Sequence, residues 1–557
     1  MVRRRGRRPL PRQRGRGLRD GAPVGRRVPR RRTLAPGTPG IRPEPANEPP
    51  PPGTLPRVKP KLPAALFLSA VLTAALSTPA AAGALELAPG VTVATTVTGE
   101  GTGHNTWTVT TQVPGGSSPD PDAPPAALGT REHAEALVTA LRGKGFAARA
   151  EQVDWPAFAD TPRGALGWRV RVGSFTDRAQ AAATASALSA NGFTGSVEWT
   201  GQDGPAAGGP QRVRVAVVDP KRFTGRVAAS HGESVAGRRT TSALAAAAGA
   251  LVGTNGGFFV IDPRDGIPGE PAGAGVYQGV LQSEATTGRP ALLLGERPSI
   301  GVPRTAITVG GHPVNGVNRK PGVIRNCGEP GDVPTDRPLH DTTCTHPDEL
   351  VLFTPQLGAP TPAGDGVEAV LDAHDVVTAV RPTGGDVPAA GHTVQGIGAA
   401  AAWLTAHARP GTRLRVDTRI FADGRPVHPA GVVNGGPWLV RDGRVSVNAA
   451  ADGIVHPGDP SFVYGWGVKR NPRTMVGLDR RGRLLIVTAD GRQPGYAEGL
   501  SLVEGAELLK RLGAVEAINL DGGGSTAMAI GGKLVSSPSD ATGERPVGDA
   551  VLVLPRR

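Results

Sequence analysis

The chain has 557 residues, room for two or three domains, and its 80 glycines and 55 prolines show no fixed period, which excludes a collagen-like rod. Its formal net charge is +14, but residues 1–61 alone hold 18 Lys/Arg and 3 Asp/Glu, a net +15. The other 496 residues therefore carry −1, and this balance argues against a nucleic-acid partner for the folded part.

The N-terminal region changes composition twice. Residues 1–56 are rich in Arg and then in Pro, with few large apolar residues, so we expect them to be disordered. Residues 57–84 hold a basic stretch, an apolar run (62–76) and a run of small residues, which predicts a secretory signal peptide cleaved near Ala82 or Ala84. The apolar run is short for a membrane span, so an uncleaved anchor is the weaker alternative. We expect a secreted protein, extracellular or cell-wall associated, without a stable membrane span.

An internal repeat follows. Residues 131–152 and 178–199 align with a period of 47, and each copy predicts an Ala-rich helix, a glycine that ends it, and a strand. Residues 168–175 alternate like a strand before the second helix, and residues 107–113 are their counterpart before the first. The unit is therefore predicted as a small ferredoxin-like βαβ-βαβ sandwich.

The strand Arg169-Val-Arg-Val-Gly-Ser-Phe175 and the repeat resemble the SPOR domain over residues 105–200. This resemblance implies binding to peptidoglycan glycan strands; a spacer with the same fold is the alternative. Residues 85–104, with Leu87-Ala-Pro-Gly-Val91, read as the first strand of the larger domain that follows. The SPOR-like unit then precedes or interrupts that domain.

From residue 211 onward, short apolar runs alternate with turns, which indicates an α+β fold built on a large mixed sheet. We expect strands at 212–218, 291–294, 306–309, 349–353, 413–416, 484–488 and 551–554, and helices at 242–250, 398–407 and 501–512. Ser501 and Glu504 have capping-box spacing at the start of the last helix. The strand, helix and strand over 484–520 predict a parallel crossover, which places Asp490 and Asp521 at one sheet edge.

Three Asn/Asp-Gly turns end apolar strands: Asn255-Gly-Gly257, Asn434-Gly-Gly-Pro437 and Asn519-Leu-Asp-Gly-Gly-Gly-Ser-Thr526. Glycine lets a ligand approach the backbone closely. The last two turns, with Asn471-Pro-Arg-Thr474, Asp490-Gly-Arg492 and Gly499-Leu-Ser-Leu502, resemble in this order the phosphodiester glycosidase domain, over residues 211–556. The resemblance implies hydrolysis of a sugar-1-phosphodiester, such as a GlcNAc-1-phosphodiester, in cell-wall or extracellular polysaccharide.

Four residues are candidates for the chemistry. Arg473 suits a phosphate clamp, because its planar guanidinium binds two oxygens at once. Asp521 is the first choice for the catalytic base or nucleophile, and a turn-stabilising role is its rival. The same two readings apply to Asp490. Glu504 is either the capping-box partner or a catalytic acid.

The candidates for substrate binding come from the glycine turns and their flanks. Backbone N–H groups of the last turn, with two hydroxyls, would form an anion nest, and the two turn asparagines would hold sugar hydroxyls or else cap turns. The full set is Asn255, Asn434, Gly435, Gly436, Thr474, Asn519, Gly522, Gly523, Gly524, Ser525 and Thr526.

Cys327 and Cys344 are the two cysteines, and in a secreted chain we expect one disulfide. A zinc site is the weaker alternative, because CxxC spacing is absent, although His340 and His346 lie nearby. No His/Asp cluster has catalytic metal spacing, so no cofactor is expected, although Asp490 and Asp521 could hold a structural cation. Two other functions stay open, a non-catalytic glycan-binding protein and a metal-dependent phosphodiesterase.

Overall fold

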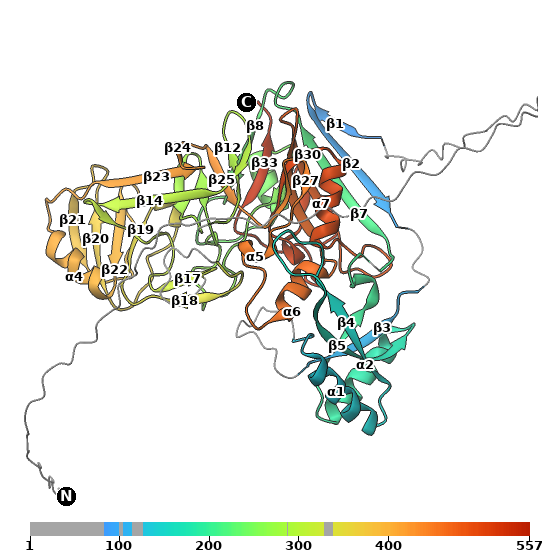
Figure 1. Cartoon of the computed structure of the whole chain (residues 1–557). Coiled ribbons are helices and arrows are strands. Elements are labelled where there is room, and N and C mark those ends of the chain that lie inside the picture. Colours follow the sequence, from blue (N-terminus) through green and yellow to red (C-terminus); the bar gives the residue numbers. More distant parts are fainter. Residues whose placement is uncertain are drawn as a thin grey trace, which may run out of the picture. The chain divides into compact units, whose positions relative to one another are not determined.

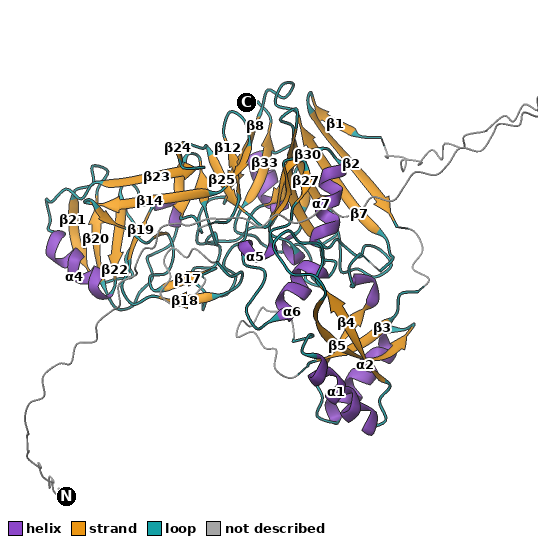
Figure 2. Ribbon diagram, viewed as in Figure 1, coloured by secondary structure: helices purple, strands orange, loops and turns teal. Residues whose placement is uncertain are grey.

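A computed structural model of the chain describes residues 83–99, 104–113, 126–205, 207–286, 288–327 and 338–556. These residues belong to one unit, Leu76–Arg557. The predicted disordered segment 1–56, and the predicted signal peptide 57–84 apart from its last two residues, lie outside the described residues. The fold is rich in strands, which are orange in Figure 2.

One antiparallel sheet forms the centre of the larger domain, and neighbouring strands pair along its whole width. In spatial order it contains β1 (Leu85–Ala88), β2 (Val91–Thr98), β7 (Gln211–Val218), β29 (Leu484–Ala489), β28 (Arg473–Asp479), β30 (Ala514–Asn519), β26 (Trp438–Arg441) and β27 (Arg444–Val445). The segment 85–104 thus supplies edge strands of the central sheet. The chain leaves this sheet after β2 and returns to it at β7.

Two further antiparallel sheets pack on one face of the central sheet. Their strands are β32 (Lys533–Leu534), β31 (Met528–Ile530), β9 (Val252–Asn255), β33 (Ala550–Leu554) and β8 (Arg226–Ser230), and β11 (Val280–Ser283), β10 (Gly275–Tyr277), β25 (Gly431–Asn434), β12 (Ala291–Leu294) and β13 (Ser299–Gly301). Side chains from all three sheets, such as Val433, Ile486 and Val551, share one buried core. Burial of these side chains provides the main stabilisation of the domain.

Helix α7 (Leu502–Arg511) covers the other face of the central sheet and lies beside β26, β27 and β30 (Figure 1). Leu502, Ala506 and Leu509 bury its apolar side against that face. The predicted capping box at its start is confirmed, and Ser501 is the N-cap residue. The flanking strands β29 and β30 both run antiparallel to β28, which lies between them, so they share a sheet and a direction without being neighbours.

A second lobe is built around another apolar core. It contains β14 (Pro303–Val309), β15 (His312–Pro313), β23 (Val416–Ala422) and β24 (Arg425–Val427), and β16 (Gly316–Val317), β19 (Leu350–Phe353), β20 (Val367–Leu371), β21 (Val377–Arg381) and β22 (His392–Gly396), with α4 (Gly398–His407). The hairpin of β17 (Val323–Arg325) and β18 (Thr343–Thr345) interrupts this lobe in sequence, between β16 and β19.

Short helices complete the described elements. They are α3 (Thr241–Ala248), α5 (Ala449–Asp452), α6 (Pro460–Val463), the 3-10 turns η1 (Thr200–Gln202), η2 (Pro355–Leu357) and η4 (Gly523–Ser525), and the π-helix η3 (Tyr464–Val468). Within the described ranges, no helix is long and apolar enough to cross a membrane.

The repeat unit contains β3 (Trp107–Thr111), α1 (Arg131–Gly143), β4 (Ala148–Asp154), β5 (Ala165–Phe175), α2 (Arg178–Ala190) and β6 (Gly195–Trp199). Its antiparallel sheet has the order β4-β5-β3-β6, and both helices pack against it (Figure 1). Val170 and Val172 lie in the helix-covered core. Because side chains alternate along a strand, Arg169 and Arg171 point to the helix-free face.

That helix-free face is a buried ion-pair network. Asp203 binds Arg171 with both oxygens, at 2.6 and 2.7 Å. Glu198 on β6 pairs with Lys469, at 3.0 Å, and Lys469 belongs to the larger domain. Although burial opposes these charges, the ion pairs raise the pKa of Arg171 and lower the pKa of Glu198 to about 2. The sheet is therefore joined to the larger domain through balanced charges.

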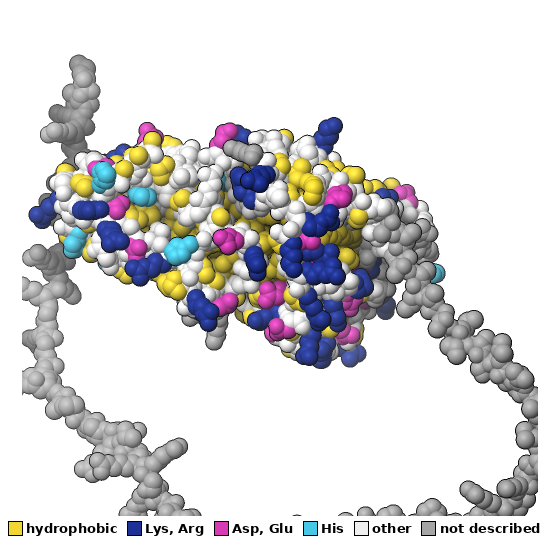
Figure 3. All heavy atoms as spheres, turned by 90° about the horizontal axis from the view of Figure 1, so that it is seen from above, with side chains coloured by type: hydrophobic (Ala, Val, Ile, Leu, Met, Phe, Trp, Pro, Cys, Tyr) yellow, Lys and Arg dark blue, Asp and Glu magenta, His cyan; other side chains and the backbone are white. Residues whose placement is uncertain are grey.

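The outer surface is also mixed in charge. On the face drawn in Figure 3, Lys and Arg side chains lie among Asp and Glu side chains rather than apart from them. This distribution agrees with the near-zero net charge of the sequence beyond residue 61.

Candidate active site

A cavity of about 490 Å³ opens where the first residue of β28 lies beside the end of β30 and the loop that follows β30. Its wall is unusually rich in charged and aromatic side chains. They are Arg238, Arg325, Arg473, Arg492, Arg545, Asp341, Asp521, Asp540, His340, Phe258, Phe259, Phe462 and Trp466. A hollow of this size with a few convergent polar groups is suited to a small ligand.

The structure brings part of the predicted site into this cavity. Arg473, Asn519, Asp521 and the glycines 522–524 line it. The other predicted residues do not: they are Asp490, Glu504, Asn255, Asn434, Gly435, Gly436, Thr474, Ser525 and Thr526. Several of these hold the lining residues in place.

Asp521 stands two residues beyond the end of β30. Its backbone carbonyl accepts a hydrogen bond from the Asn255 side-chain amide at 2.8 Å, and its N–H donates to the Gly256 carbonyl at 3.2 Å. The carboxyl is enclosed by the cavity wall, and this burial raises its pKa to about 7 against the opposing effects of Ser525 and Arg545. Asp521 can therefore gain or lose a proton near neutral pH.

Two arginines beside Asp521, Arg473 and Arg492, form no ion pair with a carboxylate of the described residues. Arg473 is 5% exposed and donates to the carbonyl oxygens of Leu500, at 2.9 Å, and Trp466. Burial and then the charge of Arg492 lower the pKa of Arg473 to about 9, so it is a cation at neutral pH. Such a cation is stabilised when an anion enters.

Arg492 has a left-handed backbone, with φ of 58°. This conformation is uncommon for a residue with a side chain and points to a functional constraint. Its guanidinium donates two hydrogen bonds to Asn471 Oδ1, at 3.0 and 2.8 Å, and lies 5.4 Å from the centre of the Trp466 ring. Burial and then Arg545 lower its pKa.

The glycine turn 522–524 lets these cations approach. A Cβ atom on Gly524 would lie 2.2 Å from Arg545 Nη2, and one on Gly523 would lie 3.4 Å from Arg492 Nη1. The N–H of Gly523 donates to the Pro472 carbonyl at 3.0 Å, so this N–H is not part of an open anion nest. The close packing explains why glycine suits these two positions.

Glu504 and Asp490 have other partners. Glu504 accepts hydrogen bonds from Arg470, at 2.7 Å, and from the Ser501 N–H, which completes the capping box. Asp490 is fully buried and accepts from Arg214, at 2.8 Å, and from the Ser537 N–H. Neither lines the cavity, so we leave both out of the proposed chemistry below.

The two turn asparagines bind protein groups. Asn255 Oδ1 accepts from the Thr474 hydroxyl, at 2.6 Å, and from the Ala527 N–H. Asn434 bonds both the N–H and the carbonyl of Phe258, at 2.9 and 3.1 Å. These amides fix the loops that carry Asp521 and Phe258.

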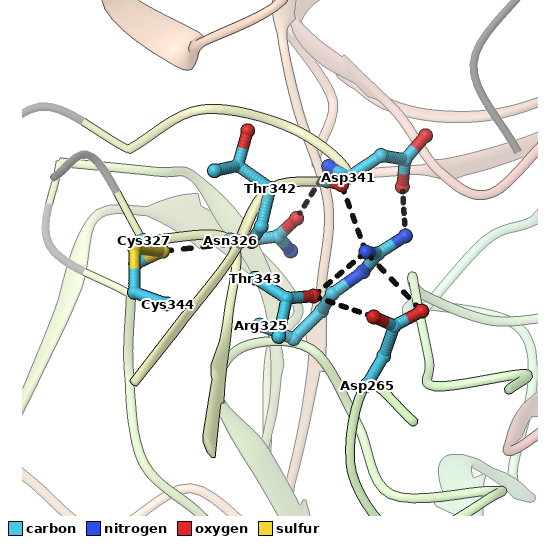
Figure 4. The surroundings of a disulfide bond; sticks show 8 residues. All are labelled: Asp265, Arg325, Asn326, Cys327, Asp341, Thr342, Thr343 and Cys344. Atoms are coloured by element: carbon cyan, nitrogen blue, oxygen red, sulfur yellow. Dashed lines mark hydrogen bonds and ion pairs between the residues drawn. A yellow bond between two sulfur atoms is a disulfide. The ribbon is translucent and has the colours of Figure 1, made fainter. Parts of the chain in front are cut away.

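A second group of lining residues belongs to the β17–β18 hairpin. The predicted disulfide is confirmed: Cys327 and Cys344 are bonded, 17 residues apart, and Figure 4 shows the bond beside Asn326 and Arg325. Asn326, Arg325, His340 and Asp341 all line the cavity. We call these four residues the hairpin wall.

His340 in this wall is buried and oriented by charged neighbours. Its Nε2 lies 2.6 Å from Asp452 Oδ2, its Nδ1 lies 3.0 Å from Arg289 Nη2, and its ring meets the Phe258 ring edge to face at 4.8 Å. Burial and then Arg289 lower the pKa of His340, so the ring is neutral at neutral pH. Among the described residues, no group of three His, Cys, Asp or Glu side chains is arranged to hold a metal ion.

Sequence reasoning missed several lining residues. Arg492 belongs to the turn Asp490-Gly-Arg492, in which the sequence points to Asp490 as the candidate and not to Arg492. Arg545 and Asp341 lie in segments without a motif, and His340 is marked in the sequence only as a neighbour of the cysteine pair, in the weaker zinc alternative. The cysteine pair is the sequence signal that marks this hairpin, and Asp341 follows His340 directly.

Family comparisons agree with this division of the chain. Residues 365–554 match the phosphodiester glycosidase family, and residues 126–197 match the SPOR domain. The chain contains a phosphodiester glycosidase domain and a SPOR domain. The first match includes Asp521 and the arginines 473, 492 and 545, whereas the hairpin wall lies outside it.

Individual relatives cover different shares of the chain. N-acetylglucosamine-1-phosphodiester alpha-N-acetylglucosaminidase of Mus musculus is 40% identical over 121 residues, which is 21% of this chain and 22% of the mouse protein. The Homo sapiens enzyme is 36% identical over 110 residues, 20% of this chain and 21% of that protein. The chain thus matches about a fifth of the length of these enzymes.

A solved structure is similar over a much larger part. The "Putative exported protein" of Burkholderia pseudomallei is 33% identical, with a TM-score of 0.74, and the similarity covers 85% of this chain and 96% of that one. The two proteins therefore share their architecture and belong to one family.

Proposed function

We propose that this protein is a hydrolase of the cell envelope or extracellular space that cleaves a sugar-1-phosphodiester at the bond between the sugar and the phosphate. The observation that carries the proposal is the cavity itself. It joins Arg473 and Arg492, for which the described residues show no ion pair, to a carboxyl group that titrates near neutral pH.

The arginines provide the phosphate site. Arg473, Arg492 and Arg545 line one cavity, and burial and then the charge of a neighbouring arginine lower the pKa values of the first two. A phosphodiester carries one negative charge, which would relieve this repulsion. Planar guanidinium groups also match the geometry of phosphate oxygens. We assign the phosphate of the substrate to Arg473 and Arg492, and to Arg545, which also pairs with Asp540 at 2.8 Å.

Asp521 provides the carboxylate. Water attacks the anomeric carbon, the bond from that carbon to the phosphate oxygen breaks, and the bonding electrons leave with the phosphomonoester. Asp521 in its ionised form either accepts the proton of the water or first attacks the carbon itself. The leaving group is stable as an anion, so the reaction needs less help from a general acid than an ordinary glycoside does.

The SPOR domain and the exported relative support the location. A SPOR domain implies contact with peptidoglycan, and we propose that this contact brings the enzyme to its substrate in the wall or in extracellular polysaccharide. The buried helix-free face of its sheet leaves the other surfaces of the unit for the glycan. Full-length protein should therefore sediment with purified peptidoglycan sacculi, and recovery in the supernatant would reduce the unit to a spacer.

Product analysis tests the proposed reaction. Purified protein is incubated with a GlcNAc-1-phosphodiester, and the products are separated and identified. Free sugar with a phosphomonoester is the expected result. Sugar phosphate with an alcohol would indicate a phosphodiesterase and overturn the proposal. Tight binding without products would support the second candidate, a non-catalytic glycan-binding protein.

A further inference from the structure

We propose that Asp341 selects the sugar of the substrate by accepting hydrogen bonds from its ring hydroxyl groups. The proposal rests on the proposed function and deepens it, because it names the part of the substrate that the hairpin wall recognises. The substrate would be a phosphodiester of a neutral sugar with free hydroxyls, rather than of an anionic sugar or a simple alcohol.

The position of Asp341 is fixed by its neighbours. Its Oδ1 atom lies 3.1 Å from Arg325 Nη2, and its backbone N–H donates to Asn326 Oδ1 at 3.0 Å. Figure 4 shows Arg325 between Asp341 and Asp265, and the Arg325 Nη1 to Asp265 Oδ2 distance is 3.5 Å. The Cys327–Cys344 bond ties the two strands beneath them. A residue held in this way can orient a ligand.

Asp341 also keeps the capacity to bind a ligand. Its side chain is 32% exposed and lines the cavity, and a carboxylate accepts about four hydrogen bonds, of which Arg325 uses part. Its backbone is left-handed, with φ of 58°, an uncommon conformation that is enriched at functional sites. In contrast, both polar atoms of the Asn326 amide bind protein groups. Its Oδ1 accepts from the Asp341 N–H and its Nδ2 donates to the Ala272 carbonyl, so Asn326 is a positioning residue.

Charge decides which part of the substrate meets Asp341. A carboxylate repels phosphate, while Arg473, Arg492 and Arg545 attract it, so the phosphate binds at the arginines. The uncharged sugar is left to the hairpin wall, where hydroxyl donors meet a carboxylate acceptor. The same charge rejects sugars that carry a carboxylate of their own.

The family match favours a role in selection over a role in the chemistry. The proposed phosphate site and Asp521 lie within residues 365–554, whereas Arg325, Asn326, His340 and Asp341 precede them. The matched region therefore holds the reacting groups. The hairpin adds polar contacts from a separate, disulfide-bonded segment.

The test compares Asp341→Asn with Asp265→Asn in the full chain. Both carboxylates contact Arg325, but Asp265 does not line the cavity, so it is a matched control. With a GlcNAc-1-phosphodiester, Asp341→Asn should raise KM by about 10- to 100-fold, the size of a charged hydrogen bond, and change kcat little. Asp265→Asn should stay within about twofold of wild type.

Inorganic phosphate separates the two parts of the cavity. Its inhibition constant should be equal in wild type and Asp341→Asn, because the arginines bind it. A loss of phosphate inhibition, equal KM effects in both variants, a fall in kcat alone, or unchanged kinetics would each overturn the proposal.

Failure of the proposed function has a different signature. If the wild type releases no product, binding of free GlcNAc is measured by calorimetry instead. Weaker binding to Asp341→Asn than to Asp265→Asn would still support sugar recognition by Asp341, and equal binding would refute it.

Discussion

Buried arginines occur at two places in this protein, with opposite surroundings. In the interface between the SPOR domain and the larger domain, burial opposes the charges of Arg169 and Arg171, but Tyr464 and Asp203 beside Arg169, and Asp203 bound to Arg171, raise the pKa of each. In the cavity, Arg473 and Arg492 are enclosed with other arginines, and their pKa values are lowered. Buried arginines thus have ion-pair partners in the interface, whereas the described residues show no ion pair for the two cavity arginines.

The carboxylates follow the same division. In the interface, Lys469 and Arg171 outweigh burial and lower the pKa of Glu198 to about 2. In the cavity, burial dominates and raises the pKa of Asp521 to about 7. We call the interface charges balanced, because each buried cation has an anionic partner, and the cavity charges unbalanced, because Arg473 and Arg492 have no ion pair in the described residues. A balanced set can join two parts of a chain, whereas an unbalanced set can be stabilised by binding a ligand of opposite charge.

The largest effect is expected at the unbalanced carboxylate. Asp521→Asn keeps the size of the side chain but removes its charge, so kcat should fall by a factor on the order of 10² or more. The melting temperature should not fall, since the fold does not favour a charge there. Steady-state rates on a GlcNAc-1-phosphodiester and thermal unfolding measure both quantities.

Glu198→Gln is the matched control in the balanced set. It should lower the melting temperature and leave activity per folded molecule unchanged. If Asp521→Asn instead loses stability while it keeps its turnover, Asp521 is a turn residue, and its catalytic role is wrong.

Removing one arginine from each region sharpens the comparison. Arg171→Met removes the guanidinium that binds both oxygens of Asp203 and leaves only Arg169, at 3.1 Å, so the free energy of unfolding should fall by about 3 kcal/mol, with kcat/KM unchanged. Arg492→Met removes an unmatched cation, so stability should be kept while kcat/KM falls by about 10- to 100-fold. Chemical denaturation and steady-state kinetics on both variants measure these effects. Equal losses of stability in the two variants would contradict the difference between the interface and cavity arginines.

Local patterns predicted much of this fold and the centre of the site. Helix α4 has the predicted bounds, and the capping box located α7 within a residue at each end. Strand β23 was expected at 413–416 but spans Val416–Ala422, because its alternating polar residues hide the apolar signal. The sequence predicted Asp521 just beyond the end of a strand, and the structure has it there in the cavity wall, since a strand followed by glycines is a local feature.

The rest of the site depends on tertiary structure. Arg545 and Asp341 reach the cavity from segments that are distant in sequence, and no local period marks them. At the turn after β29, Asp490 is bound to Arg214 and Ser537, while Arg492, two residues later, reaches the cavity. Which residue of a turn faces the ligand is set by backbone angles, and the sequence alone does not give them.

Arg473→Lys tests whether the shape of the cation matters as well as its charge. Lysine keeps the charge but loses the planar group that bonds the Leu500 carbonyl and that, in the proposed site, would bind two phosphate oxygens, so KM should rise by about tenfold. Arg470→Lys is the control, because Arg470 is paired with Glu504 outside the cavity. A rise in KM in the control as large as in Arg473→Lys would remove Arg473 from the phosphate site.

The smallest expected effect is the change of kcat/KM and of the free energy of unfolding with each unit of pH. The direction of both changes follows from the raised pKa of Asp521. Because the pKa of Asp521 is raised to about 7, its ionised form is lost as the pH falls, and kcat/KM should drop by up to about tenfold per pH unit below 7. The unfolded carboxyl titrates near pH 4, so between about pH 4 and 7 the folded state binds more protons. The free energy of unfolding should therefore decrease as the pH rises through this window.

Asp549, whose pKa burial raises to about 6, contributes in the same direction, so the comparison with Asp521→Asn isolates the share of Asp521. In that variant the acid side of the rate profile should flatten, and part of the stability change should disappear. If kcat/KM of Asp521→Asn still falls below pH 7 as in the wild type, another group of the cavity titrates there. Asp521 would then not be the catalytic carboxylate.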